Sequence, residues 1–207
     1  MYKRVKVLEN FYNDNSIENY NTGTKLDFTG YTKTIIESSD VDDELKKVVG
    51  RDKSTITEII IPDSVTSIGL GAFDYCYKLE TLKLGTGLTS IGNSAFFQCH
   101  ALPSLTIPDS VTSIGDNAFN ECKKLTELTL GTGLQRIGVN AFSGCSSLTE
   151  LTIPDSVTSI GGHAFSGCNA LTSLTLGIGL QSIEYSTFYG CNALPSITIP
   201  NNVTSIG

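Results

Sequence analysis

The chain has 207 residues, of which 40% are hydrophobic and 17% are charged, and its net charge of −7 gives a pI near 4.8. That apolar fraction supports a buried core and argues against a disordered chain. The acidic balance provides no basic surface for a phosphate backbone, and no apolar run reaches the roughly 18 residues of a membrane span, so we expect neither nucleic-acid binding nor membrane insertion.

Composition separates residues 1–38 from the rest of the chain. They are rich in Asn, Tyr and Thr, and their start carries positive charge without the apolar stretch of a secretory signal. We expect this N-terminal segment to be irregular or to form small β structure, with a hairpin between Leu26 and Ile36 as the β alternative.

Segment 39–54 predicts a capping helix followed by a linker. Ser39 is a suitable N-cap, and Gly50 suits the position just past a helix end. One apolar face would consist of Val41, Leu45, Val48 and Val49, spaced i, i+4, i+7 and i+8. This helix would cover the exposed core of the first repeat that follows it.

Residues 55–207 repeat with a period of 23. Each unit contains a Phe, a Cys three residues later and a Leu three residues after that. The six Phe and Cys pairs are Phe73 and Cys76, Phe96 and Cys99, Phe119 and Cys122, Phe142 and Cys145, Phe165 and Cys168, and Phe188 and Cys191. A second period of 46 overlies the first, because Ile-Pro-Asp-Ser-Val alternates with Leu-Gly-Thr-Gly-Leu, and this alternation indicates duplication of a two-repeat unit.

A single unit of this length cannot bury its own apolar face, so neighbouring units must stack. The motif Leu-x-x-Leu-x-Leu predicts a short strand with two inward side chains, and successive strands would pair in parallel about 4.8 Å apart. The Ala-Phe-x-x-Cys segment predicts a single helical or 3₁₀ turn on the far side. We therefore expect a solenoid of about six to seven repeats, the last one incomplete.

The full pattern, Leu-x-x-Leu-x-Leu-Pro-x-x-Val-x-x-Ile-Gly-x-x-Ala-Phe-x-x-Cys, resembles the BspA-like, or Treponema pallidum-type, leucine-rich repeats. The resemblance covers roughly residues 55–207 and implies a curved right-handed solenoid whose parallel sheet lines the concave face. It also implies recognition rather than catalysis, often at the surface of host-associated bacteria and protists. The Asn of the commoner leucine-rich repeat is replaced by Gly87, Gly133 or Ser64, so we expect no asparagine ladder.

The outward side chains of the concave sheet are the first candidate binding site, because side chains alternate across a strand. These positions are Thr81, Lys83, Ser104, Thr106, Glu127, Thr129, Glu150, Thr152, Ser173, Thr175, Ser196 and Thr198. One interpretation is a polar platform for a protein or glycan partner, and the alternative is solubility alone, since Thr favours strands. Ice binding by a flat Thr array is a more distant alternative, which leucine-rich repeat curvature opposes.

Aromatic residues outside the repeat pattern form the second candidate site. They are Tyr75, Tyr77, Phe97 and Tyr189, which flank Cys positions where other repeats have Gly, Ser or Asn. Exposed aromatic side chains are typical anchors of interfaces. They would either bind a partner or pack along the side of the solenoid.

Catalytic and metal chemistry is not indicated. Every Cys occupies the same apolar position, which predicts buried free thiols rather than disulfides, and the spacing does not suit zinc. The two histidines, His100 and His163, lie at different repeat positions and have no repeated acidic neighbour. No nucleophile, base and cleft come together, so we expect a non-enzymatic protein without a metal or another cofactor.

The leading functional hypothesis is adhesion to a host or neighbouring protein, at the cell surface as the family resemblance implies. The alternative is an intracellular interaction scaffold, because the absence of a signal peptide and the six thiols suit a reducing compartment such as the cytoplasm. The incomplete last repeat also predicts an uncapped C-terminal edge that could support end-to-end self-association.

Overall fold

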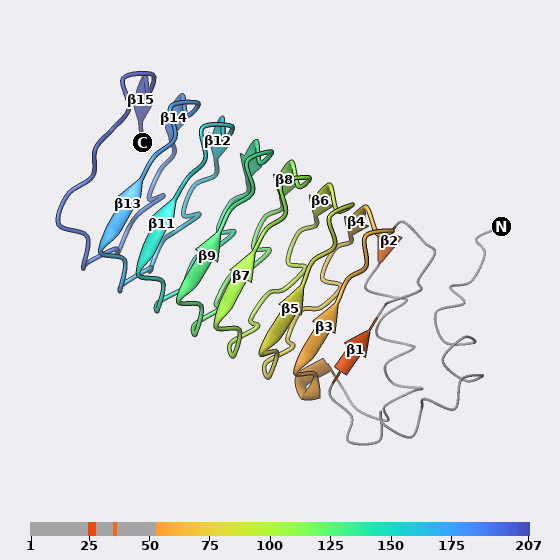
Figure 1. Ribbon diagram of the computed structural model, residues 1–207. Coiled ribbons are helices and arrows are strands. Elements are labelled where there is room, and N and C mark those ends of the chain that lie inside the picture. The colour runs from red at the N-terminus through yellow and green to blue at the C-terminus, as the bar shows by residue number, and fades with distance from the viewer. Residues whose placement is uncertain (1–24, 28–34, 37–52) are drawn as a thin grey trace, which may run out of the picture.

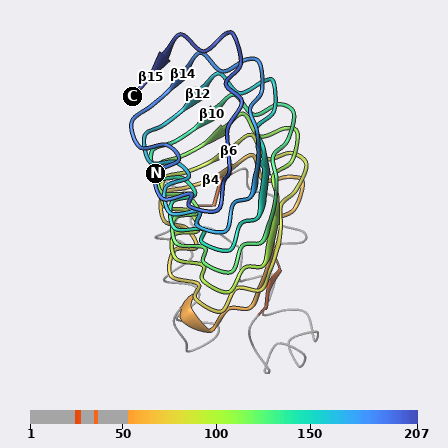
Figure 2. The ribbon, with the colours of Figure 1, turned by 90° about the vertical axis from the view of Figure 1, so that its left-hand side faces the viewer.

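The computed structural model describes residues 25–27, 35–36 and 53–207, which wind into a parallel β-solenoid of about six turns (Figure 1). A view close to the solenoid axis shows successive turns overlying one another (Figure 2). Each regular turn contributes a three-residue strand to one face and a two-residue strand to another. The described solenoid therefore has the stacked architecture that the 23-residue period predicts.

The longer strands form the first row, and the shorter strands form the second. The first row is β1 (Lys25–Asp27), β3 (Glu58–Ile60), β5 (Thr81–Lys83), β7 (Ser104–Thr106), β9 (Glu127–Thr129), β11 (Glu150–Thr152) and β13 (Ser173–Thr175). The second row is β2 (Ile35–Ile36), β4 (Ser67–Ile68), β6 (Ser90–Ile91), β8 (Ser113–Ile114), β10 (Arg136–Ile137), β12 (Ser159–Ile160), β14 (Ser182–Ile183) and β15 (Ser205–Ile206). A short 3₁₀ helix, Lys53–Thr55, precedes β3.

The pairing register places equivalent repeat positions beside one another. Leu105 pairs with Leu128, and Ile91 pairs with Ile114, in each case between parallel strands. The second-row strands form a continuous six-stranded sheet in the order β12-β10-β8-β6-β4-β2, and β14 pairs with β15. Because the register equals the sequence period, each apolar side chain lies over its equivalent in the next turn.

The expected hairpin near Leu26 to Ile36 is wrong. β1 pairs in parallel with β3, and β2 pairs in parallel with β4, so Leu26 lies beside Ile59 and Ile36 beside Ile68. Each strand therefore extends one row of the solenoid instead of pairing with the other. The helix predicted over residues 39–50 lies outside the described residues and stays a prediction.

The far side of each turn is not the helical or 3₁₀ turn that the sequence predicts. In one repeat the N–H groups of Ala95 and Phe97 donate within the turn, to Gly92 O at 3.3 Å and Ser94 O at 3.1 Å. The intervening N–H of Phe96 donates at 2.8 Å to Ala118 O in the next repeat. The segment is thus a series of β-turns in which alternate N–H groups reach the neighbouring turn.

Left-handed backbone conformations produce this alternation. Among the described residues, every residue with a positive φ lies two positions before or two positions after the repeat Phe, as Ser94 (φ 54°) and Gln98 (φ 59°) do around Phe96. A helix would direct all of its N–H groups along its own axis. A left-handed residue on each side of the Phe instead turns alternate N–H groups toward the next repeat.

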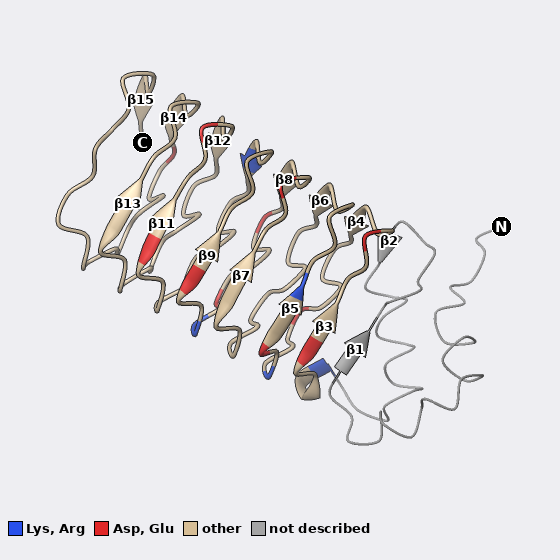
Figure 3. Cartoon of the chain, viewed as in Figure 1, with Lys and Arg blue, Asp and Glu red and all other residues tan. Residues whose placement is uncertain are grey.

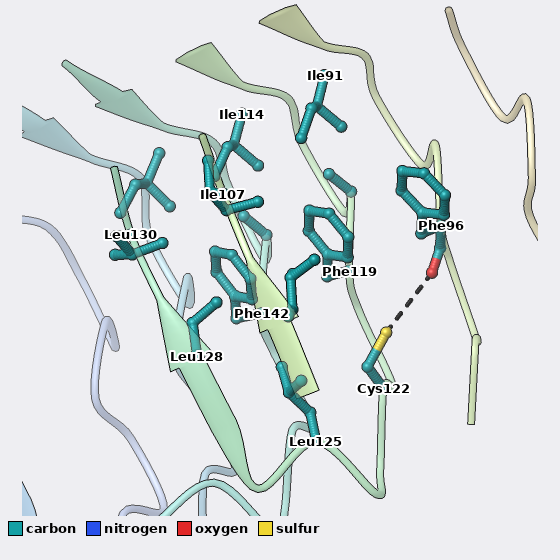
Figure 4. Close-up of a cluster of buried hydrophobic side chains, with 14 of the residues drawn as sticks. Ile91, Phe96, Ile107, Ile114, Phe119, Cys122, Leu125, Leu128, Leu130 and Phe142 are labelled. Carbon is teal, nitrogen blue, oxygen red and sulfur yellow. Dashed lines mark hydrogen bonds between the residues drawn. The ribbon is translucent and has the colours of Figure 1, made fainter. Parts of the chain in front are cut away.

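The core is a set of parallel ladders, of which the Phe ladder is the largest (Figure 4). Phe96 and Phe119 have ring centroids 5.1 Å apart with planes 6° apart, and Phe119 and Phe142 repeat this arrangement at 5.3 Å. Leu, Ile and Val side chains fill the space between the Phe rings and the strands; most are buried, and some, such as Leu82, Leu84 and Leu174, are partly buried. Stacked aromatic pairs contribute about 0.5–1.5 kcal/mol beyond the area they bury.

The 46-residue period corresponds to two different junctions between turns. In one, the Thr132 N–H and hydroxyl both donate to the Asp109 carboxylate, at 2.7 and 3.0 Å. In the other, the hydroxyl of Ser156 donates at 2.7 Å to the Leu134 carbonyl. Because the amide and hydroxyl of Thr132 stabilise the carboxylate, they hold the pKa of Asp109 below its ordinary value.

The glycines of the Gly-Thr-Gly turn are required by this packing. A Cβ on Gly133 would overlap the backbone carbonyl oxygen of Asp109, and one on Gly131 would overlap the carbonyl of Pro108. The Pro-Asp turn of one repeat and the Gly-Thr-Gly turn of the next are therefore complementary surfaces.

The core ladder makes a first prediction. Phe119→Ala removes a ring that is stacked on both sides and fully buried, so we expect a loss of about 3–5 kcal/mol in the free energy of unfolding. Urea denaturation followed by circular dichroism measures it, with the exposed Thr129→Ala as a control expected to change stability by less than about 0.5 kcal/mol. A loss below about 1 kcal/mol for Phe119→Ala would contradict the ladder.

The close approach at the alternating turns makes a second prediction. Gly133→Ala should destabilise the protein by about 1–3 kcal/mol, because the added methyl group forces the Asp109 backbone away. The same urea experiment measures this loss against the Thr129→Ala control. An unchanged unfolding midpoint would show that the two turns are not in the described contact.

Candidate partner-binding surfaces

The outward side chains of the first strand row form a polar surface, here called the strand face. All twelve positions that the sequence assigns to it, from Thr81 to Thr198, are exposed. The register aligns them in rows, so that Thr106 lies beside Thr129, and Thr152 beside Thr175. The structure thus places the ten positions from Thr81 to Thr175 on the first strand row, whereas Ser196 and Thr198 are exposed but lie in no described strand. The role of these residues in binding and the concave curvature of this face stay predictions.

The outward threonines of the strand face differ in their hydrogen bonding from the threonines that directly precede a strand. Thr89 and Thr112, which precede β6 and β8, donate their hydroxyls to the Thr66 and Thr89 carbonyls at 2.8 and 3.1 Å, and Thr126, which precedes β9 of the first row, donates in the same way to the Pro103 carbonyl at 3.0 Å. On the strand face, by contrast, the hydroxyls of one Thr row form no hydrogen bond with another residue of the described chain; these are Thr106, Thr129, Thr152, Thr175 and Thr198. These hydroxyls are available to a partner.

Charge varies along the strand face. Glu127 and Glu150 occupy the same position in adjacent turns, and neither forms an ion pair with another described residue. Lys83 is the one cation among the outward positions of β5 to β13 (Figure 3). Exposed like charges in neighbouring strands are mildly destabilising, so the face is not optimised for stability alone.

The structure brings together three of the four predicted aromatic residues. The ring of Tyr75 lies 5.9 Å from that of Tyr77 and 5.5 Å from that of Phe97, the latter in an edge-to-face contact. Tyr75 and Tyr77 are 44% and 38% exposed, so the cluster lies at the surface. Tyr189 is also exposed but lies five repeats away along the solenoid.

His100 joins this cluster, although the repeat pattern does not single it out as a functional residue. Its ring lies 5.1 Å from the ring of Tyr77, and its Nε2 atom is buried without a hydrogen-bond partner among the described residues. Burial and the nearby Lys123 charge lower the pKa of His100, partly offset by Glu121. The only signal in the sequence is that His100 occupies the position equivalent to Tyr77 in the next repeat.

The six cysteines are free thiols along one ladder, and five are buried. Each thiol after the first donates to the carbonyl of the preceding repeat Phe, as Cys122 does to Phe96 O at 3.6 Å (Figure 4). Burial raises the pKa of Cys122 to about 12. Cys191 is only half-buried because it lies in the last described turn, which differs from the expectation that all six are buried.

Lys53 carries a buried charge at the position equivalent to Cys76, 23 residues earlier in the chain. The ammonium group of Lys53 contacts the Asp74 carboxylate at 2.6 Å and the Gly71 carbonyl at 3.0 Å.

Among the described residues, no three His, Cys, Asp or Glu side chains gather closely enough to hold a metal ion. None of the helical segments in the described ranges is long and apolar enough to cross a membrane.

Parallel strand rows, apolar ladders and an outward polar face built from a leucine-bearing repeat define a leucine-rich repeat solenoid. A family model described as the BspA type leucine rich repeat region matches residues 51–172 and 135–207 with six copies, and the chain belongs to this family. No curated protein sequence matches the chain significantly.

Two solved structures are similar to the chain. A leucine-rich repeat protein from T. pallidum is 32% identical, with a TM-score of 0.69 over 72% of each chain. A leucine-rich repeat protein from Eubacterium ventriosum is 30% identical, with a TM-score of 0.67 over 72% of this chain and 41% of that one. The chain therefore spans less than half of the second protein.

The thiol ladder makes a third prediction. At pH 8, an aromatic disulfide reagent should label Cys191 first, because this thiol is partly accessible and its hydrogen bond with Cys168 lowers its pKa. The five buried thiols should react slowly, since burial hinders both access and ionisation. Cys191→Ser should remove the fast phase, and denaturant should make all remaining thiols react together. Rapid labelling of several thiols in the native Cys191→Ser protein would contradict the buried ladder.

Proposed function

We propose that the protein is a non-enzymatic recognition module that binds a protein or glycan partner on its strand face. The observation that supports this most directly is the difference between the outward strand positions and the positions that precede the strands. In both rows, threonine hydroxyls at the preceding positions donate to backbone carbonyls, whereas the Thr106-to-Thr198 row of the strand face leaves its hydroxyls to solvent. Membership of a repeat family that generally serves binding agrees with this role.

The mechanism is rigid presentation of a broad surface. Backbone hydrogen bonds and buried ladders fix the spacing of the turns, so outward side chains change the surface without changing the scaffold. Thr129 and Thr152 in the centre offer hydroxyls, while Glu127 and Glu150 beside them offer paired negative charge. Hydroxyls and carboxylates at fixed spacing suit a polar partner surface with donors of its own.

Adhesion to a host or neighbouring protein is the leading biological role within this proposal. The alternative is an intracellular scaffold, and the six free thiols favour it, because thiols persist best in reducing compartments. Antibody accessibility on intact and on permeabilised cells separates the two. Signal on intact cells supports adhesion, and signal only after permeabilisation supports the scaffold.

The strand face makes a fourth prediction, tested with a matched pair of variants in one turn. Thr152→Lys places a long cation on the strand face, where Lys83 shows that the row accepts lysine. Ser159→Lys places the same cation on the second row, beside Arg136 of the adjacent turn. We expect Thr152→Lys to keep the wild-type melting temperature and Ser159→Lys to lower it only slightly, because its ammonium group lies beside Arg136. Only Thr152→Lys should weaken partner binding, by about tenfold or more.

The partner for this measurement is identified by photo-crosslinking. A photoreactive amino acid at Thr129 should capture the partner, while the same residue at the second-row position Ser159 should not. Equal capture from both positions, or unchanged affinity of Thr152→Lys, would exclude the strand face as the binding surface.

A further inference from the structure

A second surface, separate from the strand face, lies on the bends that lead from the Phe turns into β5 and β7. It contains four rings that contact one another in the order Phe97, Tyr75, Tyr77 and His100. The Tyr75 and Tyr77 planes are inclined by 58°, and the Tyr75 and Phe97 planes are nearly perpendicular, at 88°. The rings of Tyr75 and Tyr77 thus present exposed aromatic surface in two orientations.

The backbone of Tyr75 indicates that the ring is not there for the fold. Tyr75 has a φ of 59°, a conformation that an aromatic L-residue rarely adopts. The equivalent positions are Gln98 (φ 59°) and Glu121 (φ 63°) in the next two repeats, and Gly144, Gly167 and Gly190 in the last three, where glycine adopts positive φ without strain. A glycine at position 75 would satisfy the turn, and Tyr75 is the one aromatic side chain among the described residues at this position. Strain of this kind is characteristic of functional positions.

Basic side chains border the rings. Lys78 and Lys124 occupy equivalent exposed positions, two residues after Cys76 and Cys122, and neither has an ion-pair partner among the described residues. Lys123 lies close enough to His100 to lower its pKa and pairs with Glu121 at 3.0 Å. Figure 3 shows blue segments in the turns that lead into β5 and β9.

This combination is confined to the first three Cys-containing repeats. The later repeats replace the basic and aromatic residues with small polar or apolar ones at the same positions, namely Ser146 and Ser147, Asn169 and Ala170, and Asn192 and Ala193. In a chain with a net charge of −7, a local group of unpaired lysines beside exposed rings departs from the average surface. Rings and cations together favour a ligand that has both flat C–H surfaces and negative charge.

We propose that Tyr75, Tyr77, Lys78 and Lys124 form a binding edge for an acidic polysaccharide that carries uronate groups. The C–H face of a pyranose ring bears partial positive charge and is attracted to the negative face of an aromatic ring. The uronate carboxylates pair with the lysine ammonium groups. A folded protein partner fits less well, because four rings on two adjacent turns are far fewer than the roughly 20–30 residues per side of a stable protein interface.

Calorimetric titration of the full chain with defined oligosaccharides tests this proposal. The probes are hyaluronan oligosaccharides and oligogalacturonate as two sources of uronate, with chitooligosaccharides as a neutral control and an oligoglutamate peptide as an acidic non-sugar control. We expect at least one uronate probe to bind, more weakly as salt is raised, and neither control to bind comparably.

Variants that copy other repeats keep the result interpretable. Tyr75→Gly copies Gly144, and Tyr77→Ser copies Ser146, so both should fold, and Tyr75→Gly should melt at the same or a higher temperature because its strain is relieved. Each should weaken uronate binding about tenfold or more. Tyr189→Ser removes an exposed ring five repeats away and should leave binding unchanged.

Several outcomes would overturn the proposal. These are the absence of binding to both uronate probes, equal binding of the neutral sugar, and uronate binding that Tyr75→Gly and Tyr77→Ser leave intact. Equal binding of oligoglutamate, insensitive to the two ring variants, would show a simple basic patch or a peptide site instead. Thr152→Lys on the strand face should not affect this edge, so the two binding proposals succeed or fail separately.

Discussion

The solenoid depends on one constraint: each turn must satisfy its backbone and bury its apolar side chains against an equivalent turn. In the strand rows the equivalent residues pair in parallel, as Leu105 and Leu128 do. On the far side, the N–H of Phe96 reaches Ala118 O in the next repeat, and the rings of Phe96 and Phe119 stack with nearly parallel planes. Both interactions require the same offset along the axis, so a change in repeat length would disrupt them together.

The left-handed residues beside each Phe connect this constraint to function. They direct alternate N–H groups along the solenoid axis toward the next turn, whereas a helix would direct all of its N–H groups along its own axis. They occur at every described Phe turn. Ser94, Asn117 and Asn140 fill the first of these positions with short polar side chains, which tolerate a positive φ better than most residues. At the second position, Tyr75, Gln98 and Glu121 adopt the same conformation in the first three repeats, and glycine replaces them in the last three. The backbone requirement is therefore met by larger side chains only in the repeats that carry the aromatic cluster and Lys124.

The sequence period predicts the structural features that recur in every repeat, but it does not predict those that occur only once. The strand at Thr81–Lys83 and the buried Phe ladder follow from the 23-residue spacing, because spacing fixes both register and facing side. The pairing of Leu26 with Ile59 could not be predicted, since the intervening chain is longer than one repeat.

The Ala-Phe turn resembles a helical turn because both make short-range contacts between residues three apart. Only the recurrence of Gly, Asn and Ser before Ala-Phe hints at left-handed positions. The aromatic cluster depends on contacts between repeats, which the spacing of individual aromatic residues does not reveal.

Two kinds of threonine position show why one solenoid can keep its scaffold constant and still acquire a recognition surface. Just before the strands, Thr158 of the second row and Thr172 of the first row donate their hydroxyls to the Gln135 and Thr149 carbonyls, so changing these side chains alters a contact between turns. On the strand face, Thr152 has no such bond to the described chain, and its equivalents include Lys83 and Thr106 on the same backbone. Substitution there changes what a partner meets but leaves the pairing of β11 with β13 intact. Specificity can therefore vary at the outward strand positions at little cost to folding, whereas variation at the threonines that precede the strands is limited by the contacts that join the turns.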